Sequence, residues 1–269
     1  MINNEKYTKL INCLKKLEKV VLAFSGGVDS TFLLKAATEA LGDNLKAVTI
    51  QSPYIPKWEI EEAKQFIAQL GVAFEIIETP VIDEIRNNPE NRCYLCKKAV
   101  FSQIKAFAQR EGYLYVIDGT NFDDLGDYRP GLKALSELAI KSPLLECQFS
   151  KQEIRSLSKE LGLSTWDKPP YACLLTRIPY GNKLKEEDFV KIEKAEKYMM
   201  AQGFRAIRVR CHDNLARIEV DKKDRSKLFN EELLEEIAGK LKEFGFKYVT
   251  LDLQGYRVGS FNETLGNKL

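Results

Sequence analysis

Histidine is almost absent from this chain, since His212 is the single one among 269 residues. A zinc site built mainly from histidines is therefore excluded, and acid–base chemistry would fall to His212 or to carboxylates, lysines and tyrosines. The sequence also lacks an apolar run approaching the roughly 20 residues that a membrane helix requires. The chain also lacks an excess of either charge, because 41 basic residues nearly balance 39 acidic ones. These absences predict a soluble, cytoplasmic protein that contacts no membrane and carries no broad surface for nucleic acid.

What the chain does contain is an apolar strand that runs into a glycine turn and then opens a helix, with the sequence VVLAFSGGVDST over residues 20–31. Gly26 and Gly27 can adopt backbone angles that a Cβ forbids, so successive amides can point at one anion. The dipole of the following helix and nearby hydroxyl groups would add to this attraction. Asp29 could hold the magnesium ion that accompanies a polyphosphate. The segment predicts a phosphate site, although small residues at an ordinary strand–turn–helix junction give the same letters.

The SGGVDS turn resembles the PP-loop, SGGxDS, of the ATP pyrophosphatase superfamily, and it matches neither Walker A nor the dinucleotide fingerprint. That resemblance implies that ATP adenylates an oxygen of the substrate and that pyrophosphate leaves into the loop. A nitrogen or sulfur nucleophile would then displace AMP. GMP, NAD and asparagine synthetases and tRNA thiolases share the loop, so the rest of the chain must identify the nucleophile.

Apolar strand-like runs alternate with helical periodicity through the first two thirds of the chain. We expect strands over 20–24, 46–51, 73–78 and 114–118, a shorter one near 143–145, and helices over 31–41, 57–70 and 94–110. This order predicts an α/β fold with a doubly wound parallel sheet, whose ligands bind at the carboxyl ends of the strands. Ser150 and Glu153 form a capping box that predicts a helix through Leu161.

A proline-rich segment over 166–180 precedes a change of pattern. Residues 186–202 read as a helix, 205–211 and 216–220 as a hairpin, 225–244 as mainly helical and 248–253 as a last strand. This αββαβ order predicts a small α+β domain at the carboxyl end. We therefore expect a PP-loop domain over 1–181 and a substrate-binding and assembly domain over 182–269.

Six cysteines in a chain of this kind point to metal chemistry, redox chemistry or core packing before a disulfide framework. Cys93 and Cys96 are spaced to share one metal, and Cys173 lies in the proline-rich segment. Three thiolates can hold three irons of a 4Fe-4S cluster and leave the fourth open to an external ligand. A packed or redox-active pair remains the alternative. Core packing accounts for the others, with Cys147 and Cys211 expected at strands or strand ends and Cys13 on an apolar helix face.

The PP-loop, DYRPGLK over 127–133, YACLLTRIPYG over 171–181 and EKY over 196–198 together resemble the LarE family of ATP-dependent sulfur transferases over nearly the whole chain. The resemblance implies adenylation of each carboxylate of pyridinium-3,5-biscarboxylic acid mononucleotide and its conversion to a thiocarboxylate. This reaction serves the nickel-pincer nucleotide cofactor of lactate racemase. In one style of the family, the cysteine at the position of Cys173 donates its own sulfur once and becomes dehydroalanine. In the other, three cysteines hold a 4Fe-4S cluster that carries sulfide from an external source, and Cys93, Cys96 and Cys173 match that style.

The same resemblance implies roles for further residues. Those expected to hold ATP and its magnesium ion are Ala23, Phe24, Ser25, Gly26, Gly27, Asp29 and Ser30, with Gly119 and Thr120 as weaker candidates. Those expected near the substrate are Asp127, Arg129, Thr176, Arg177, Glu196, Arg208, Arg210, Glu219 and Arg257. Arg208 and Arg210 share a strand face and suit the nucleotide phosphate, whereas solvent-exposed strand arginines are the alternative. The resemblance also implies a homo-oligomer.

Two other functions fit parts of the pattern. A tRNA thiolase can combine a PP-loop with three cysteines, but the small net charge and the lack of a recognisable RNA-binding module disfavour it. A zinc-stabilised module that binds ATP without transferring sulfur is the alternative outside the enzymes.

Overall fold

The computed structural model describes residues 4–126, 130–257 and 260. The chain forms two compact units. The first unit comprises Met1–Ile85 and Asn91–Pro170, and the second comprises Arg86–Glu90 and Tyr171–Leu269. In the described part of the chain, no helix is both long and apolar enough to cross a membrane.

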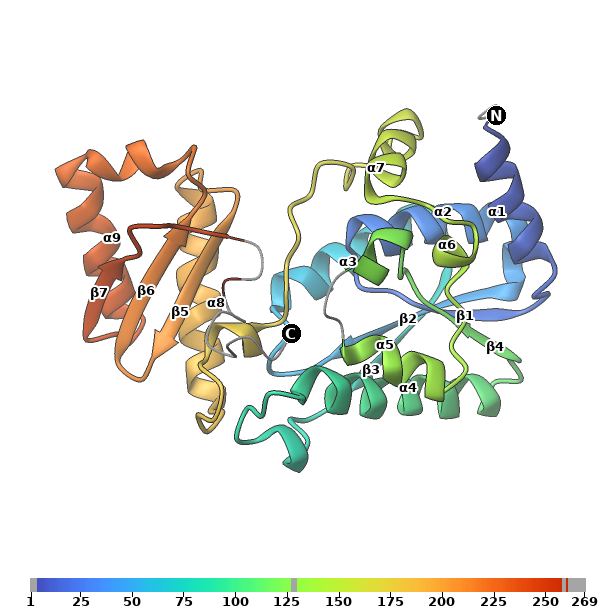
Figure 1. Cartoon of the computed structure of the whole chain (residues 1–269), viewed down its shortest axis with the longest axis horizontal. Coiled ribbons are helices and arrows are strands. Elements are labelled where there is room, and N and C mark those ends of the chain that lie inside the picture. Colours follow the sequence, from blue (N-terminus) through green and yellow to red (C-terminus); the bar gives the residue numbers. More distant parts are fainter. Residues whose placement is uncertain (1–3, 127–129, 258–259, 261–269) are drawn as a thin grey trace. The chain divides into compact units, whose positions relative to one another are not determined.

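The first unit is built on a parallel sheet whose strands lie in the order β3-β2-β1-β4 (Figure 1). The strands are β1 (Val20–Ala23), β2 (Leu45–Gln51), β3 (Ala73–Glu78) and β4 (Tyr115–Ile117). The chain steps outward from β1 to β3 and then returns to place β4 on the other side of β1. The predicted α/β class is confirmed, and ligand crevices of such sheets open where the strand order reverses.

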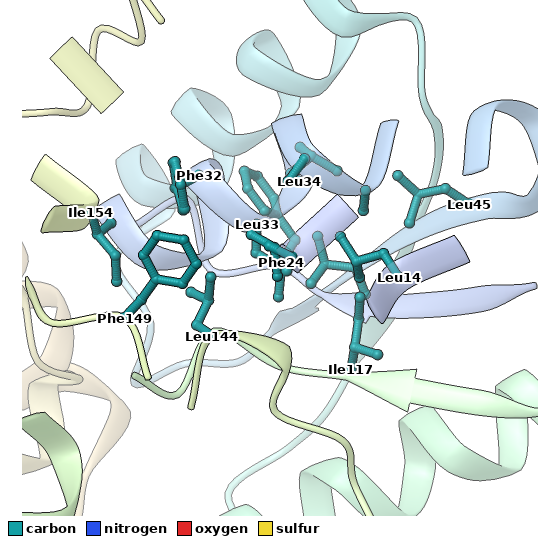
Figure 2. Close-up of a cluster of buried hydrophobic side chains, with 14 of the residues drawn as sticks. Leu14, Phe24, Phe32, Leu33, Leu34, Leu45, Ile117, Leu144, Phe149 and Ile154 are labelled. Carbon is teal, nitrogen blue, oxygen red and sulfur yellow. The ribbon is translucent and has the colours of Figure 1, made fainter. Parts of the chain in front are cut away.

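Helices cover both faces of this sheet (Figure 1). They are α1 (Glu5–Lys15), α2 (Val28–Leu41), α3 (Lys57–Leu70), α4 (Arg92–Arg110), α5 (Pro130–Glu137), α6 (Pro143–Glu146) and α7 (Lys151–Glu160). Successive strand residues point to opposite faces. Leu22 therefore joins the cluster that includes residues of α1, α2 and α7, whereas Val21 joins the cluster that includes residues of α4. Figure 2 shows the first cluster, in which the rings of Phe32 and Phe149 meet edge to face with centroids 5.5 Å apart.

The prediction of a strand near residues 143–145 is wrong, because this segment forms the short helix α6. Pro143 lies in the first turn of α6, where a missing amide hydrogen costs nothing and the fixed φ suits a helix. Just before α6, Lys141 forms an isolated parallel β-bridge with Ile117 of β4. The short apolar run was therefore a buried helical turn.

The second unit contains α8 (Glu186–Ala201), β5 (Ile207–His212), β6 (Leu215–Val220), α9 (Glu231–Glu243) and β7 (Tyr248–Leu251). β5 and β6 form an antiparallel hairpin, and β7 lies parallel to β6 at the edge of the sheet. The predicted αββαβ order is confirmed. Residues 171–181, with the short 3-10 helix η4 (Leu174–Arg177), belong to this unit.

Candidate active site

The glycine turn joins the end of the central strand β1 to the start of α2. Gly26 adopts a left-handed φ of 69°, and Gly27 is the residue that precedes the first helical turn. The hydroxyl of Ser30 donates to the Gly27 carbonyl over 3.2 Å and lies 3.1 Å from the hydroxyl of Ser25. The helix begins at Val28, three residues before the predicted start. The first amides of α2 therefore belong to the loop itself, as an anion site at a helix terminus requires.

The base of this loop is fixed to the neighbouring strand. The Phe24 amide donates to the Val48 carbonyl over 2.8 Å, and the Thr49 hydroxyl donates to the Phe24 carbonyl over 2.8 Å. The Phe24 ring is buried and stacks on Phe66 with ring centroids 6.3 Å apart. Ala23 is the last residue of β1. Ala23 and Phe24 thus support the loop through packing and backbone hydrogen bonds.

The chain after β4 packs against this loop at Gly119. A Cβ on Gly119 would lie 3.0 Å from the amide nitrogen of Ser30 and 3.2 Å from its Cα. The adjacent Thr120 hydroxyl donates to Asp118 over 2.6 Å, and Ser142 donates to the other Asp118 oxygen over 2.6 Å. The segments that follow β1 and β4 therefore meet where the strand order reverses, and Gly119 is required there by close packing.

Gly119→Ala is expected to raise the KM for ATP by about tenfold, because backbone atoms at the start of α2 cannot move away as a flexible side chain would. A steady-state ATP titration measures this effect. Gly126→Ala serves as the control, since none of the described residues has an atom within 4 Å of a Cβ at Gly126. Equal ATP kinetics in the two variants would show that the contact at Gly119 does not shape the loop.

Asp29 lies in the first turn of α2 and has two differently occupied oxygens. Oδ2 accepts a hydrogen bond from the ammonium group of Lys151. Oδ1 is buried and, among the described residues, has no hydrogen-bond partner. A carboxylate oxygen that is buried without a donor is costly, and a hard cation would satisfy it. Asp29 therefore fits the magnesium role expected from the sequence.

Two lysines that no sequence motif indicates lie beside the loop. Lys151 is the first residue of α7, and its neighbour Ser150 forms the predicted capping box with Glu153. Lys168 donates to the Gly26 carbonyl over 3.1 Å and to Glu62 over 2.8 Å. The capping box located the start of α7, but no local pattern indicates that this start lies beside a loop 122 residues earlier.

Cys93 and Cys96 lie in the first turns of α4, in the first unit. Cys93 is exposed, whereas Cys96 is partly buried, with its sulfur 3.2 Å from the hydroxyl of Tyr54. Burial raises the pKa of the Cys96 thiol, and the Tyr54 hydrogen bond acts in the opposite direction. The six cysteines all lie in the described part of the chain, and none of them is in a disulfide. The pair at 93 and 96 thus offers two sulfur ligands from one helix.

The other cysteines are placed for packing. Cys147 and Cys211 are buried, and burial raises their thiol pKa values to about 11 and about 12. Cys211 belongs to β5 as expected, but Cys147 ends the helix α6 and does not lie at a strand. Cys13 packs against the core of the first unit. Thiols so weakly acidic are poor nucleophiles.

Cys173 precedes η4 in the second unit, and its carbonyl is held by two side chains. The Thr176 hydroxyl donates to it over 3.0 Å and Arg177 donates over 3.2 Å. Arg177 is itself buried and forms a two-pronged ion pair with Glu196 at 2.9 and 2.8 Å. Glu196 also accepts from the amide of Val209 over 2.9 Å. Arg177 therefore fixes the backbone at Cys173 to α8, and a contact with substrate stays a prediction.

Arg208 and Arg210 lie on β5 and are buried, so the alternative of solvent-exposed strand arginines is wrong. Arg210 forms a two-pronged ion pair with Glu219 at 2.9 and 2.8 Å. The Arg208 guanidinium lies 4.8 Å from the ring centroid of Tyr256 and 6.0 Å from that of Tyr171. Burial, and then the charge of Arg177, lower the pKa of Arg208. The second unit thus buries the side chains of three arginines close to those of Glu196 and Glu219.

The remaining predicted residues are less informative. Arg257 is partly buried and contacts the Gly255 carbonyl over 3.5 Å. Asp127 and Arg129 lie outside the described residues.

Over residues 4–126, 130–257 and 260, no group of three or more His, Cys, Asp or Glu side chains is gathered to hold a metal ion. Of the three cysteines expected to share a cluster, two lie in the first unit and one in the second.

The chain just before Cys93 is bonded to the chain just after Cys173, a link that no local sequence pattern indicates. The buried side chain of Asn88 donates to the carbonyls of Ile178 over 2.7 Å and Pro179 over 3.0 Å. The Gly181 amide in turn donates to the Asn88 carbonyl over 3.1 Å. Residues 86–90 consequently belong to the second unit although the flanking chain belongs to the first.

The parallel sheet with an SGGxDS loop at its central strand defines a PP-loop protein, and the NAD synthase family model accordingly matches residues 6–109. Pyridinium-3,5-bisthiocarboxylic acid mononucleotide synthase of Lactiplantibacillus plantarum is 38% identical over 97% of this chain and 95% of its own length. The chain belongs to that family, the LarE family. An uncharacterized protein of Synechocystis sp. is 42% identical over 93% of this chain and 94% of its own length. A glutamine-hydrolyzing GMP synthase component of Thermoplasma volcanium is 32% identical over 63% of this chain and 59% of its own length.

Proposed function

We propose that this protein is an ATP-dependent sulfur transferase that adenylates the carboxylates of pyridinium-3,5-biscarboxylic acid mononucleotide and converts them to thiocarboxylates. The product serves the nickel-pincer nucleotide cofactor of lactate racemase. The observation that carries this proposal is the full-length similarity to a relative named for the bisthiocarboxylic acid product. The PP-loop at the end of β1 supports the use of ATP.

In the adenylation step, a substrate carboxylate oxygen attacks the α-phosphorus of ATP and the bond to the β-phosphate oxygen breaks. Pyrophosphate leaves toward the loop over residues 25–30, where the first amides of α2 and the hydroxyls of Ser25 and Ser30 receive its charge. Asp29 is the residue that would hold magnesium there. Gly119 and Thr120 belong to the segment after β4, which packs against this loop. One ATP is consumed for each carboxylate.

In the second step, sulfide attacks the acyl carbon and AMP departs with the oxygen that the carboxylate supplied, leaving a thiocarboxylate. We propose Cys93, Cys96 and Cys173 as the ligands of a 4Fe-4S cluster. When bound by three cysteines, such a cluster has one open iron that can carry sulfide. Two free thiols on one helix support this role, and so does Asn88, which bonds the chain five residues before Cys93 to the segment after Cys173.

The arginine cluster of the second unit is proposed to bind the substrate's phosphate. Arg208 contributes a guanidinium that stacks on Tyr256 and donates to the Ile207 carbonyl over 2.6 Å, while Arg210 is fixed by Glu219. Guanidinium groups held in fixed positions suit a phosphate, because their planar donors can form charge-assisted, two-pronged hydrogen bonds with its oxygens. Glu196 then orients Arg177 and Glu219 orients Arg210, and Arg257 directly follows Tyr256, on whose ring Arg208 lies.

The substrate is tested by measuring AMP release with the biscarboxylate nucleotide and, separately, with bulk tRNA. We expect release that depends on MgATP and on the nucleotide. Stimulation by tRNA alone would identify a tRNA thiolase instead. Colourless protein with tightly bound zinc and no pyrophosphate release would identify a nucleotide-binding module without transferase activity.

Cys93→Ala, Cys96→Ala and Cys173→Ala are each expected to lose the brown colour and the bound iron of anaerobically purified protein, because each removes one cluster ligand. Iron and acid-labile sulfide assays with an absorption spectrum measure the loss. Cys13→Ala is the control, since Cys13 packs against the core of the first unit. Absence of iron from the unmodified protein, with single-use activity that needs Cys173 but neither Cys93 nor Cys96, would instead support donation of the Cys173 sulfur.

A further inference from the structure

The cation beside the proposed magnesium ligand is Lys151. Its ammonium group donates to Oδ2 of Asp29, while Oδ1 of the same carboxylate is buried and lacks a partner among the described residues. Both residues belong to the first unit. One oxygen of the Asp29 carboxylate is therefore paired with a cation, and the other is left for a further ligand.

The backbone of Lys151 is anchored, so only its side chain can relocate. Its amide donates to Asp123 over 2.9 Å, and the preceding Ser150 caps α7 together with Glu153. Glu153 is held in turn by Lys6 at 2.7 Å. The Lys151 side chain remains 37% exposed, and a lysine stem has four flexible carbons that allow it to reach several positions from one fixed Cα.

An unpaired carboxylate beside the loop would repel a polyphosphate, and a lysine fixed permanently on Asp29 would compete with magnesium for that carboxylate. Both the repulsion and the competition disappear if Lys151 leaves Asp29 for the phosphates when magnesium binds the carboxylate. We propose that Lys151 is the resting counter-ion of Asp29 and passes to the terminal phosphates when magnesium takes the carboxylate, so that it binds the departing pyrophosphate. This inference rests on the proposed role of the loop over residues 25–30 as the pyrophosphate site.

A lysine that merely stabilises the fold through a surface ion pair behaves differently. Its loss would leave metal and pyrophosphate affinity unchanged or, if the loop were damaged, would weaken both together. The exchange predicts opposite changes, because one ligand loses a competitor while the other loses a partner.

The test uses the full chain with Lys151→Met, which removes the charge and keeps the length of the side chain. The Kd of Mn²⁺ alone, measured by electron paramagnetic resonance, is expected to fall at least about threefold, because Mn²⁺ suits carboxylate ligands and no longer competes with the ammonium. The Kd of pyrophosphate at saturating Mg²⁺, measured by calorimetry, is expected to rise about ten- to hundredfold, which is the range for a charge-assisted hydrogen bond.

Lys159→Met is the matched control, because Lys159 is an exposed lysine of the same helix whose ammonium lies 4.6 Å from the ring centroid of Trp166. It is expected to change neither Kd. Unchanged affinities in Lys151→Met, or weakening of both ligands together, would overturn the exchange. Failure of the unmodified chain to bind pyrophosphate or MgATP is a separate result, which would contradict the proposed use of ATP at this loop.

Discussion

Asp29→Asn is expected to lower ATP-dependent pyrophosphate release by about 100- to 1,000-fold, the range seen when a group that stabilises transition-state charge is removed. The substitution keeps the shape of the side chain but removes the negative charge that would hold magnesium. It also removes the charge that faces Lys151. A coupled phosphate assay with MgATP and the biscarboxylate nucleotide measures the rate.

The iron content of the same variant is expected to stay unchanged, because Asp29 lies in the first turn of α2 and the cysteines lie on other segments. Asp43→Asn is the control, since Asp43 is an exposed carboxylate in the 3-10 helix that follows α2. Full activity of Asp29→Asn would remove Asp29 from the magnesium site. A decline shared by Asp43→Asn would point to general damage of the helix.

Arg177→Met is expected to lower the free energy of unfolding by about 3–5 kcal/mol, because it leaves the Glu196 carboxylate buried without its cation. Both side chains of this pair are almost fully buried, with 1% and 6% exposure. Urea denaturation followed by circular dichroism measures the loss. Lys240→Met is the control, because its ion pair with Glu243 is exposed and is expected to contribute less than about 1 kcal/mol.

A double variant separates the loss of the pair from the burial of a lone charge. Arg177→Met combined with Glu196→Met is expected to recover part of the stability, since both charges leave the interior together. It is not expected to recover sulfur transfer, because Arg177 also holds the carbonyl of Cys173. If Arg177→Met costs no more stability than Lys240→Met, the ion pair is not the anchor of the Cys173 segment.

Elements with a strong local pattern were predicted well from the sequence. The helix α3 and the strand β3 have the expected bounds, because each is a long periodic run with clear ends. The start of α2 was placed three residues late, since the glycine turn is tighter than the small residues indicate. Residues 143–145 were predicted wrongly because a short apolar run fits a buried strand and a buried helical turn equally.

The site was predictable only where its chemistry is local. The glycine loop and the Cys93–Cys96 pair are contiguous in the sequence and were found there. The contact between Lys151 and Asp29 joins residues 122 apart, and that between Asn88 and Ile178 joins residues 90 apart. Such pairs arise from the tertiary fold and leave no mark on local periodicity. Arg208 and Arg210 were expected to share a face of β5, and the structure adds that both are buried.

Counting turnovers tests whether the protein survives the transfer of sulfur. Anaerobically reconstituted protein is mixed with MgATP, sulfide and the biscarboxylate nucleotide, and thiocarboxylate, AMP and the mass of the polypeptide are measured. Several thiocarboxylates per chain, one AMP for each, and an unchanged mass are the results that we predict. At most one thiocarboxylate per chain, with a polypeptide lighter by the mass of hydrogen sulfide, would show instead that a cysteine of the protein is consumed.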